Sequence, residues 1–337
     1  MVQPLVSVII PFFNREILLP RAIQSVIRQR YALWELILVD DASTDKSFFV
    51  ADSYRRRFPD KIFVIRQNVN KGPGASANLG IENSHGEYIA FLDSDDEWYP
   101  NLLEVVMQAF AEAAEVDWVF YNHRRISDST KEVVCLSAFD REITKEFREL
   151  RFRTVKNLKV IDDPELLSVA ISKTICAGAN SVIRRRLFSD LRFTESARIG
   201  QDRLLVMEAI LKGKKFAFID EILLDVYMHG KNISIVDDIN NSLPKACQIS
   251  SDLILVYEYM EKFKKYLNCH EKIALRKRLG NLYINRGRLM RYKGDGKLLE
   301  ASIYYVRGLG KWPCNLSFWN GVVKKCFRLV THLDFGR

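Results

Sequence analysis

The sequence has no apolar run long enough to cross a membrane and no closely spaced pair of cysteines. A membrane-spanning helix needs about 20 mainly apolar residues, and polar or charged residues interrupt each apolar stretch of this chain before that length. The six cysteines are scattered without a Cys-x-x-Cys pair, which argues against a zinc site or a disulfide framework. Pro4 and the polar residues 14–16 interrupt the first apolar stretch, so it does not resemble a signal peptide. We therefore expect a cytoplasmic protein.

The composition is that of a globular protein with an excess of positive charge. The chain has 337 residues, 48% of them hydrophobic, and a formal net charge of +9. This length allows one large domain or two smaller ones. A basic protein favours anionic partners such as nucleotides, anionic lipid or nucleic acid. Because no nucleic-acid-binding module is recognisable in the sequence, we expect no nucleic-acid partner.

Short apolar runs alternate with segments of helical periodicity in the first third of the chain. Between the runs, apolar residues recur at helical spacing, as in 18–27 and 102–110. This alternation predicts a doubly wound α/β sheet with ligands at the carboxyl ends of its strands. The first run, 6–11, is typical of a strand buried on both faces. The other predicted strands cover 35–39, 62–65, 88–92 and 117–121.

Acidic residues follow two of these predicted strands. Asp40 and Asp41 end the second strand, and residues 93–96 place three carboxylates after the fourth. Clustered carboxylates at the end of a buried strand repel one another, and a divalent cation such as Mg²⁺ or Mn²⁺ would remove that cost. Together with the glycine-rich loop 70–74, the two acidic strand ends predict one crevice lined by acids. The alternative is a solvated acidic turn that caps the helix beginning near Pro100.

The middle of the chain is harder to assign. Residues 124–160 are polar and mixed, which predicts a long irregular excursion that forms a mobile flap over the crevice. Residues 184–186 are three arginines, which indicate a solvated turn, with a phosphate clamp as the alternative. A helix is predicted over 201–211, followed by two short strands at 216–219 and 223–228.

Helical patterns dominate after Ile235. Apolar residues three and four apart over 249–267 predict a long amphipathic helix, and further helices are expected over 271–292 and from about Leu298. Residues 311–330 mix aromatic and basic side chains, a pattern that suits either a helix in a membrane interface or a helix packed on the preceding α/β domain.

Five segments of the chain together resemble the family 2 glycosyltransferases, and their order and spacing match as well. The segments are 8–14, 38–45, 70–73, 77–80 and 91–96. The resemblance covers about residues 6–234 and implies the GT-A fold, a nucleotide-sugar donor, a divalent cation (Mn²⁺ or Mg²⁺) and inversion at the anomeric carbon. It further implies a catalytic domain over 1–235, with a nucleotide-sugar-binding half over 1–100 and an acceptor-side half over 101–235, followed by a helical region over 236–337.

The resemblance also assigns roles to single residues. Asp202 stands where the family has its catalytic base. The implied metal ligands are Asp93, Asp95 and His229, with Asp96 as a possible additional one. The implied donor-binding residues are Pro11, Asp40, Asp41, Asn70, Gly72, Asp93 and Ser94.

Structural roles are the alternative for several of these residues. Asp202 could simply cap the helix that it opens, and His229 could be an ordinary loop histidine. Asp41 could be a turn former, and Gly72 could serve only the turn in which it lies.

Three positions depart from the family pattern. The glutamate that usually precedes the base is Gln201, the arginine common before the loop asparagine is Ala77, and the arginine often two residues before the histidine is Tyr227. These departures bear on donor identity and diphosphate affinity more than on the chemistry itself.

The resemblance and the acidic strand ends together predict an inverting glycosyltransferase. It would move a sugar from a nucleotide-diphospho-sugar, a UDP-sugar by expectation, to an acceptor hydroxyl in polysaccharide, glycolipid or cell-envelope glycan synthesis. The expected partners are the donor, a glycan or lipid-linked acceptor, and an anionic membrane surface at its cytoplasmic face, where the protein would be peripheral. The alternative is a catalytically inactive protein that binds nucleotide sugars or acts as a scaffold.

Overall fold

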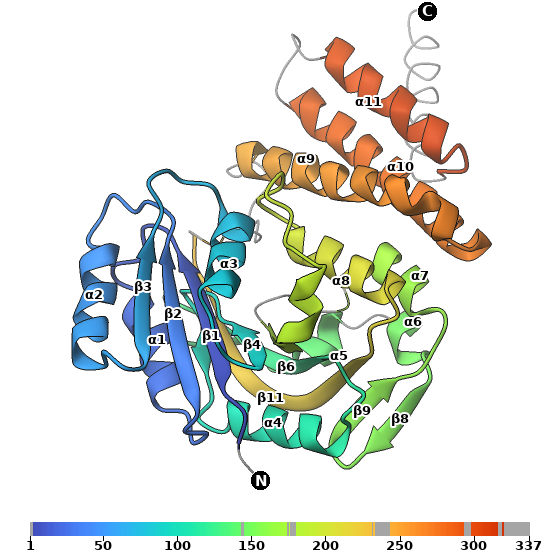
Figure 1. The fold of residues 1–337 in the computed structure, drawn as a ribbon. Coiled ribbons are helices and arrows are strands. Elements are labelled where there is room, and N and C mark those ends of the chain that lie inside the picture. The colour runs from blue at the N-terminus through green and yellow to red at the C-terminus, as the bar shows by residue number, and fades with distance from the viewer. Residues whose placement is uncertain are drawn as a thin grey trace, which may run out of the picture. The chain divides into compact units, whose positions relative to one another are not determined.

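The computed structural model describes residues 3–142, 145–173, 175, 180–230, 232, 243–292, 298–315 and 319. Its internal contacts divide the chain into two compact units, Met1–Ile235 and Val236–Arg337. The first unit contains a mixed sheet of 11 strands flanked by helices, and the described part of the second unit is helical (Figure 1).

The sheet has the strand order β3-β2-β1-β4-β10-β6-β11-β9-β8, with β5 paired to β11 and β7 paired to β6. Strands β1 to β4 run parallel, β10 is antiparallel to both β4 and β6, and β11 is parallel to β6. The strands are β1 (Val6–Phe12), β2 (Trp34–Asp40), β3 (Ile62–Arg66), β4 (Tyr88–Phe91), β5 (Glu97–Trp98), β6 (Trp118–Ser127), β7 (Val133–Cys135), β8 (Phe152–Val155), β9 (Leu158–Ile161), β10 (Ser181–Arg184) and β11 (Phe216–Met228). The predicted doubly wound α/β sheet is confirmed.

Helices cover both faces of this sheet. The helices of the first unit are α1 (Leu19–Ile27), α2 (Ser47–Arg57), α3 (Pro73–Glu82), α4 (Leu102–Glu112), α5 (Ala138–Glu142), α6 (Lys145–Arg148), α7 (Leu166–Ser172), the 3₁₀ helix η2 (Arg185–Ser189) and α8 (Gln201–Leu211). Helices α1, α2 and α4 share one buried core with alternate residues of β1, β2 and β4, such as Val8 and Leu36. On the opposite face, α3 approaches so closely that a Cβ at Gly80 would lie 2.5 Å from Ile9 Cγ2.

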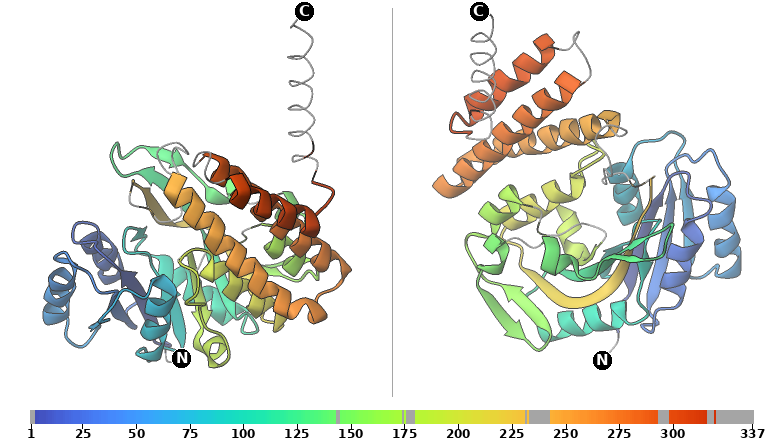
Figure 2. Two further views of the ribbon diagram at one scale, coloured as in Figure 1. Left: turned by 90° about the horizontal axis from the view of Figure 1, so that it is seen from above. Right: turned by 180° about the vertical axis from the view of Figure 1, so that it is seen from behind.

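The prediction of an irregular flap over 124–160 is wrong. Strand β6 continues to Ser127, and β8 and β9 extend the sheet beyond β11 (Figures 1 and 2). Helix α4 lies along the outer side of β11. The polar part of β6 is held by ion pairing, since Arg124 Nε and Nη2 donate to Asp225 at 2.8 and 2.7 Å. Aromatic packing holds the rest of the segment: Phe147 and Phe152 pack on Phe218 of β11, with ring centroids 5.5 and 5.1 Å apart.

Two smaller predictions are also corrected. The three arginines at 184–186 are neither a solvated turn nor a phosphate clamp, because they bind the body of the domain. Arg184 Nε donates to Val116 O at 2.8 Å, Arg185 Nε donates to Gly86 O at 2.5 Å, and Arg186 pairs with Asp117 at 2.6 Å. The two short strands predicted at 216–219 and 223–228 are one strand, β11, with register shifts between Ile219 and Leu224.

The second unit contains α9 (Leu243–Met260), the 3₁₀ helix η3 (Glu261–Tyr266), α10 (Cys269–Tyr292) and α11 (Leu298–Lys311). Helices α10 and α11 pack closely where a Cβ at Gly308 would lie 2.6 Å from Ile284 Cγ1. Across the described residues, no helix is both long and apolar enough to span a membrane. Most of the predicted amphipathic segment at 311–330 lies outside the described residues.

Candidate active site

The acidic residues lie at one edge of the sheet. Strands β2, β1 and β4 are parallel neighbours, and Phe12 at the end of β1 pairs with Asp40 at the end of β2. Adjacent strands are roughly 5 Å apart, so the two groups of acids are separated by about 10 Å across β1. The sheet therefore places Asp40 and Asp41 beside the acidic turn at 93–96.

Asp41 organises the glycine-rich loop. Its carboxylate accepts hydrogen bonds from Lys71 N at 2.7 Å, Gly72 N at 2.9 Å and Gln67 Nε2 at 2.9 Å. Gly72 has a φ of 92°, a conformation that glycine adopts without a steric cost. Asn70 Nδ2 donates to the Asp41 carbonyl at 3.1 Å. Asp41 is itself buried, and through these hydrogen bonds it holds the loop in place.

Asp40 has a more enclosed position than Asp41. It is fully buried, and its Oδ1 accepts a hydrogen bond from Ser43 N at 2.8 Å. Its Oδ2 lies 3.1 Å from Arg66 Nε without hydrogen-bond geometry. This carboxylate supports the turn after β2, and its predicted contact with a donor stays a prediction.

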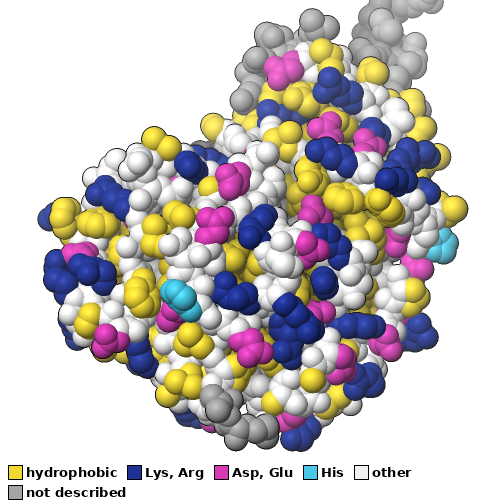
Figure 3. Space-filling model, in the orientation of Figure 1, with side chains coloured by type: hydrophobic (Ala, Val, Ile, Leu, Met, Phe, Trp, Pro, Cys, Tyr) yellow, Lys and Arg dark blue, Asp and Glu magenta, His cyan; other side chains and the backbone are white. Residues whose placement is uncertain are grey.

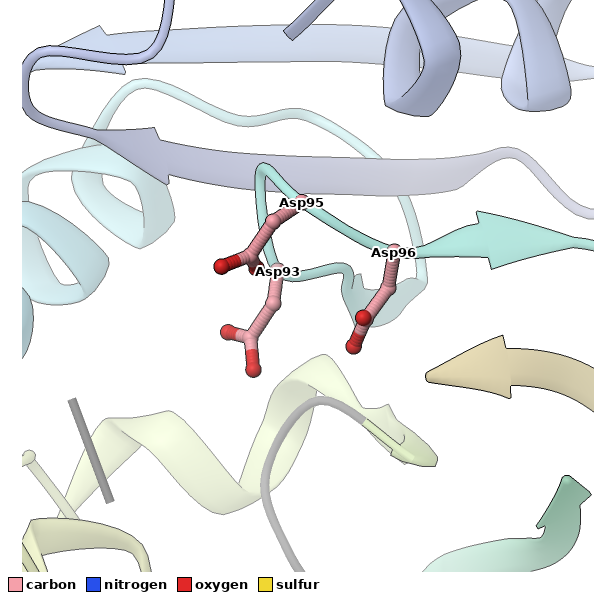
Figure 4. Close-up of side chains that lie close together, drawn as sticks. All are labelled: Asp93, Asp95 and Asp96. Carbon is pink, nitrogen blue, oxygen red and sulfur yellow. The ribbon is translucent and has the colours of Figure 1, made fainter. Parts of the chain in front are cut away.

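The turn after β4 carries a compact group of three carboxylates. Asp93, Asp95 and Asp96 project to the same side of the turn (Figure 4), and one oxygen from each lies within 4.8 Å of the others. Asp93 is exposed, whereas Asp95 and Asp96 are 9% and 3% exposed. Carboxylate oxygens are the ligands that Mg²⁺ and Mn²⁺ prefer, so this donor set fits one hard divalent cation.

Two of these carboxyls hold their protons unusually tightly. Although Asp93 is exposed on one side, its packed surroundings raise its pKa to about 7, with Asp95 and Asp202 adding repulsion and Arg15 opposing them. Burial, together with Asp95 and Asp93, raises the pKa of Asp96 well above its ordinary value. Asp96 Oδ1 also accepts a hydrogen bond from Tyr227 N at 3.0 Å. A cation would relieve the repulsion among these acids.

His229 reaches the same turn from the end of β11. Its Nε2 lies 3.0 Å from Asp95 Oδ2, and Arg15 Nε lies 3.8 Å from that oxygen. Arg21 Nη2 donates to the Asp95 carbonyl at 2.5 Å, and its guanidinium stacks 3.4 Å from the ring centroid of Tyr227. The turn is therefore fixed to both α1 and β11.

Asp202 lies at the start of α8. Gly200, with a φ of 85°, precedes the helix, and Asp202 Oδ1 accepts a hydrogen bond from Arg203 N at 2.9 Å. The charge of Asp202 contributes to the raised pKa of Asp93, which places the two carboxylates near one another. The neighbouring Gln201 Oε1 is buried and, in the part of the chain that the structure describes, has no hydrogen-bond partner.

A comparison with protein-family models identifies the family to which the chain belongs. The model described as glycosyl transferase family 2 matches residues 7–192, which is more than half of the chain. The chain belongs to this family. The matched region contains the acidic strand ends, the loop at 70–72 and the turn at 93–96.

The chain is also similar to curated glycosyltransferases and to solved structures. The chain is 44% identical over 106 residues to the putative colanic acid biosynthesis glycosyl transferase WcaA of Escherichia coli, an alignment that covers 31% of this chain and 37% of WcaA. The chain spans less than half the length of WcaA and of other curated relatives that it matches. Among solved structures, S. aureus TarS 1-349 in complex with UDP-GlcNAc gives a TM-score of 0.54 at 18% identity, over 90% of this chain and 89% of that one.

A second solved structure is the mannosyltransferase PcManGT from Pyrobaculum calidifontis in complex with GDP-Man and Mn²⁺. It gives a TM-score of 0.55 at 16% identity and covers 94% of this chain and 89% of that one. At these identities the structures show the fold alone. The predicted GT-A fold of the family is confirmed.

The remaining candidate residues occupy the same edge of the sheet. Pro11 lies in β1 opposite Val39 of β2, and Ser94 is buried in the acidic turn. Sequence reasoning missed two contributors, Arg15 and Arg21, because each contacts the turn through the fold and belongs to no acidic or glycine-rich motif. A signal was available for Arg15, which lies three residues after the end of β1, at the edge where ligands bind.

Proposed function

We propose that the chain is a metal-dependent inverting glycosyltransferase that moves a sugar from a UDP-sugar to an acceptor hydroxyl in cell-envelope glycan synthesis. The observation that supports the proposal is that, in a family 2 chain, Asp41 and the acidic turn at 93–96 follow neighbouring strands and Asp202 is near enough to raise the pKa of Asp93. The biosynthetic role named for WcaA and the ligands named for TarS and PcManGT support the class of reaction.

Each carboxylate has a separate part in this mechanism. The loop held by Asp41 would receive the nucleoside, while Asp93 and Asp95, with Asp96 or His229, would hold Mn²⁺ or Mg²⁺. When bound, the cation would neutralise charge on the leaving diphosphate. Asp202 would accept the proton of the acceptor hydroxyl as its oxygen bonds to C1 and the bond from C1 to the diphosphate breaks. General-base help of this kind is worth roughly 10²- to 10⁴-fold in rate.

A peripheral position at the cytoplasmic face of the membrane is part of the proposal. A lipid-linked glycan acceptor would be available there, and the chain carries a net charge of +9, which favours anionic surfaces. On the face shown in Figure 3, however, Lys and Arg side chains lie among Asp and Glu. This face therefore offers no surface of positive charge alone, and we propose that a dedicated segment provides the anchor.

The test is release of nucleoside diphosphate from UDP-GlcNAc, UDP-glucose and GDP-mannose in the presence of Mn²⁺. Asp202→Asn should reduce release at least about 100-fold while leaving donor binding intact. Asp60→Asn, which removes an exposed acid after α2, is the matched control and should not change the rate. Tight donor binding without turnover by the wild type would instead favour the inactive binding protein.

A further inference from the structure

The segment between β10 and α8 packs against α3 and is hydrogen-bonded to it. Asn78 Nδ2 donates to Phe193 O at 2.9 Å, and Phe193 N donates to Asn78 Oδ1 at 3.0 Å. A Cβ at Gly74 would lie 2.4 Å from Thr194 O, so the two backbones pass too closely for any other residue there. The residues that lead into α8 are therefore held beside the glycine-rich loop.

Arg198 extends from this segment across the loop. Its Nη2 donates to Asn70 Oδ1 at 2.6 Å, and its Cγ lies 3.6 Å from the position that a Cβ at Gly72 would take. Asn70 in turn donates to the carbonyl of Asp41. Arg198 is an exposed residue, so a permanent positive charge stands over the loop that Asp41 organises and four residues before Asp202.

The charge balance of the site calls for such a cation. A nucleoside diphosphate carries about three negative charges near neutral pH, and it would enter a site that already holds Asp41, Asp95 and Asp202. A single divalent cation offsets only part of that charge. Helix α3, which opens at the loop, contains no Lys or Arg of its own; Lys71 precedes it in the loop, and Arg15 lies beside Asp95. Arg198, from the segment between β10 and α8, supplies a guanidinium cation at this loop. The planar guanidinium can donate two parallel hydrogen bonds to phosphate oxygens.

We propose that Arg198, held by Asn70, binds the diphosphate of the donor. The assignment rests on the proposed function, because it presumes a nucleoside diphosphate in the crevice. It differs from a purely structural role for Arg198, in which the side chain would only fix the loop at 70–72 and so support the nucleoside and the diphosphate equally.

The test compares ligands that differ only in phosphate content. Titration calorimetry of the full chain with Mn²⁺ would measure dissociation constants for uridine, UMP and UDP, and for guanosine, GMP and GDP. In Arg198→Met the dissociation constant for the preferred nucleoside diphosphate should rise about 10- to 100-fold, the usual effect of losing a hydrogen bond to a charged group. The constant for the free nucleoside should stay unchanged, and Arg198→Lys should recover part of the loss.

A control separates a local contact from a general loss of charge. Arg57→Met removes one exposed arginine from the outer helix α2 and should leave every constant unchanged. Equal weakening of nucleoside and diphosphate binding in Arg198→Met, or no weakening of either, overturns the assignment. If the wild type binds neither series, the proposed function fails and the assignment fails with it.

Discussion

Metal binding should be coupled to the release of protons from the acidic turn. The pKa of Asp93 is raised to about 7 by its packed surroundings, Asp95 and Asp202, so near neutral pH this carboxyl is about half protonated. A cation binds only the deprotonated form, and protons therefore compete with it. The perturbation is a change of pH from 8 to 6 at fixed Mn²⁺.

The expected magnitude follows from the competition. With a pKa of about 7, protonation weakens the apparent Mn²⁺ affinity by a factor of about 1.1 at pH 8 and about 11 at pH 6. The apparent dissociation constant should therefore rise about tenfold over this range from Asp93 alone. Asp96, whose pKa is also raised, adds in the same direction. At pH 7 each Mn²⁺ should displace at least about half a proton.

Titration calorimetry in two buffers of different ionisation enthalpy would count these protons directly, and it requires no catalytic activity. Asp202→Asn supplies an internal control because it removes a charge that raises the pKa of Asp93 without removing one of the three clustered carboxylates. In this variant the pH dependence should move to lower pH. An affinity that is equal at pH 6 and pH 8, with no proton released, would refute the reasoning.

Three further predictions concern the rest of the chain. Burial opposes ionisation of Glu35, but hydrogen bonds from Ser7 and His85 outweigh it and hold its pKa below 4.5. In urea titrations at pH 7, Glu35→Gln should therefore lower the free energy of unfolding by about 1–3 kcal/mol. The variant should also show less of the stability loss that the wild type shows below pH 4.5. Burial lowers the pKa of His123 to about 4, so this histidine is neutral in the folded protein at pH 5 but protonated in the unfolded chain. From this group alone, the wild type should be about 2 kcal/mol less stable at pH 5 than at pH 7. In thermal melting, His123→Phe should remove that difference. Removing the residues after Trp312 should reduce sedimentation with anionic vesicles by at least about tenfold, and unchanged sedimentation would exclude this segment as the anchor.

The strands and their acidic ends could be predicted because their signals are local. Residues 6–11 are apolar apart from Ser7, and β1 is buried along nearly its whole length. Asp40 and Asp41 directly follow such a run, so the rule that ligands meet the carboxyl ends of parallel strands was enough to place them. The acidic turn at 93–96 was predicted in the same way.

The parts that could not be predicted depend on contacts between distant residues. The polar half of β6 is a strand because Arg124 pairs with Asp225, 101 positions away. Arg198 meets Asn70 across 128 positions. Neither contact leaves a periodic pattern in the sequence, and a polar segment that is stabilised by ion pairs across the sheet looks the same as a solvated loop.

The two acidic groups at this edge of the sheet handle their charge in different ways, and the difference bears on how a donor would bind. The carboxylate of Asp41 is satisfied by backbone N–H groups of Lys71 and Gly72, so the loop beside it is formed without any ligand. The carboxyls of Asp93 and Asp96 instead have raised pKa values, and a bound cation would favour their charged forms. Under the proposed function, the nucleoside part of the site would thus be preorganised, whereas the diphosphate part would be completed by the metal. Selectivity between nucleosides would then operate before the reactive phosphate is engaged.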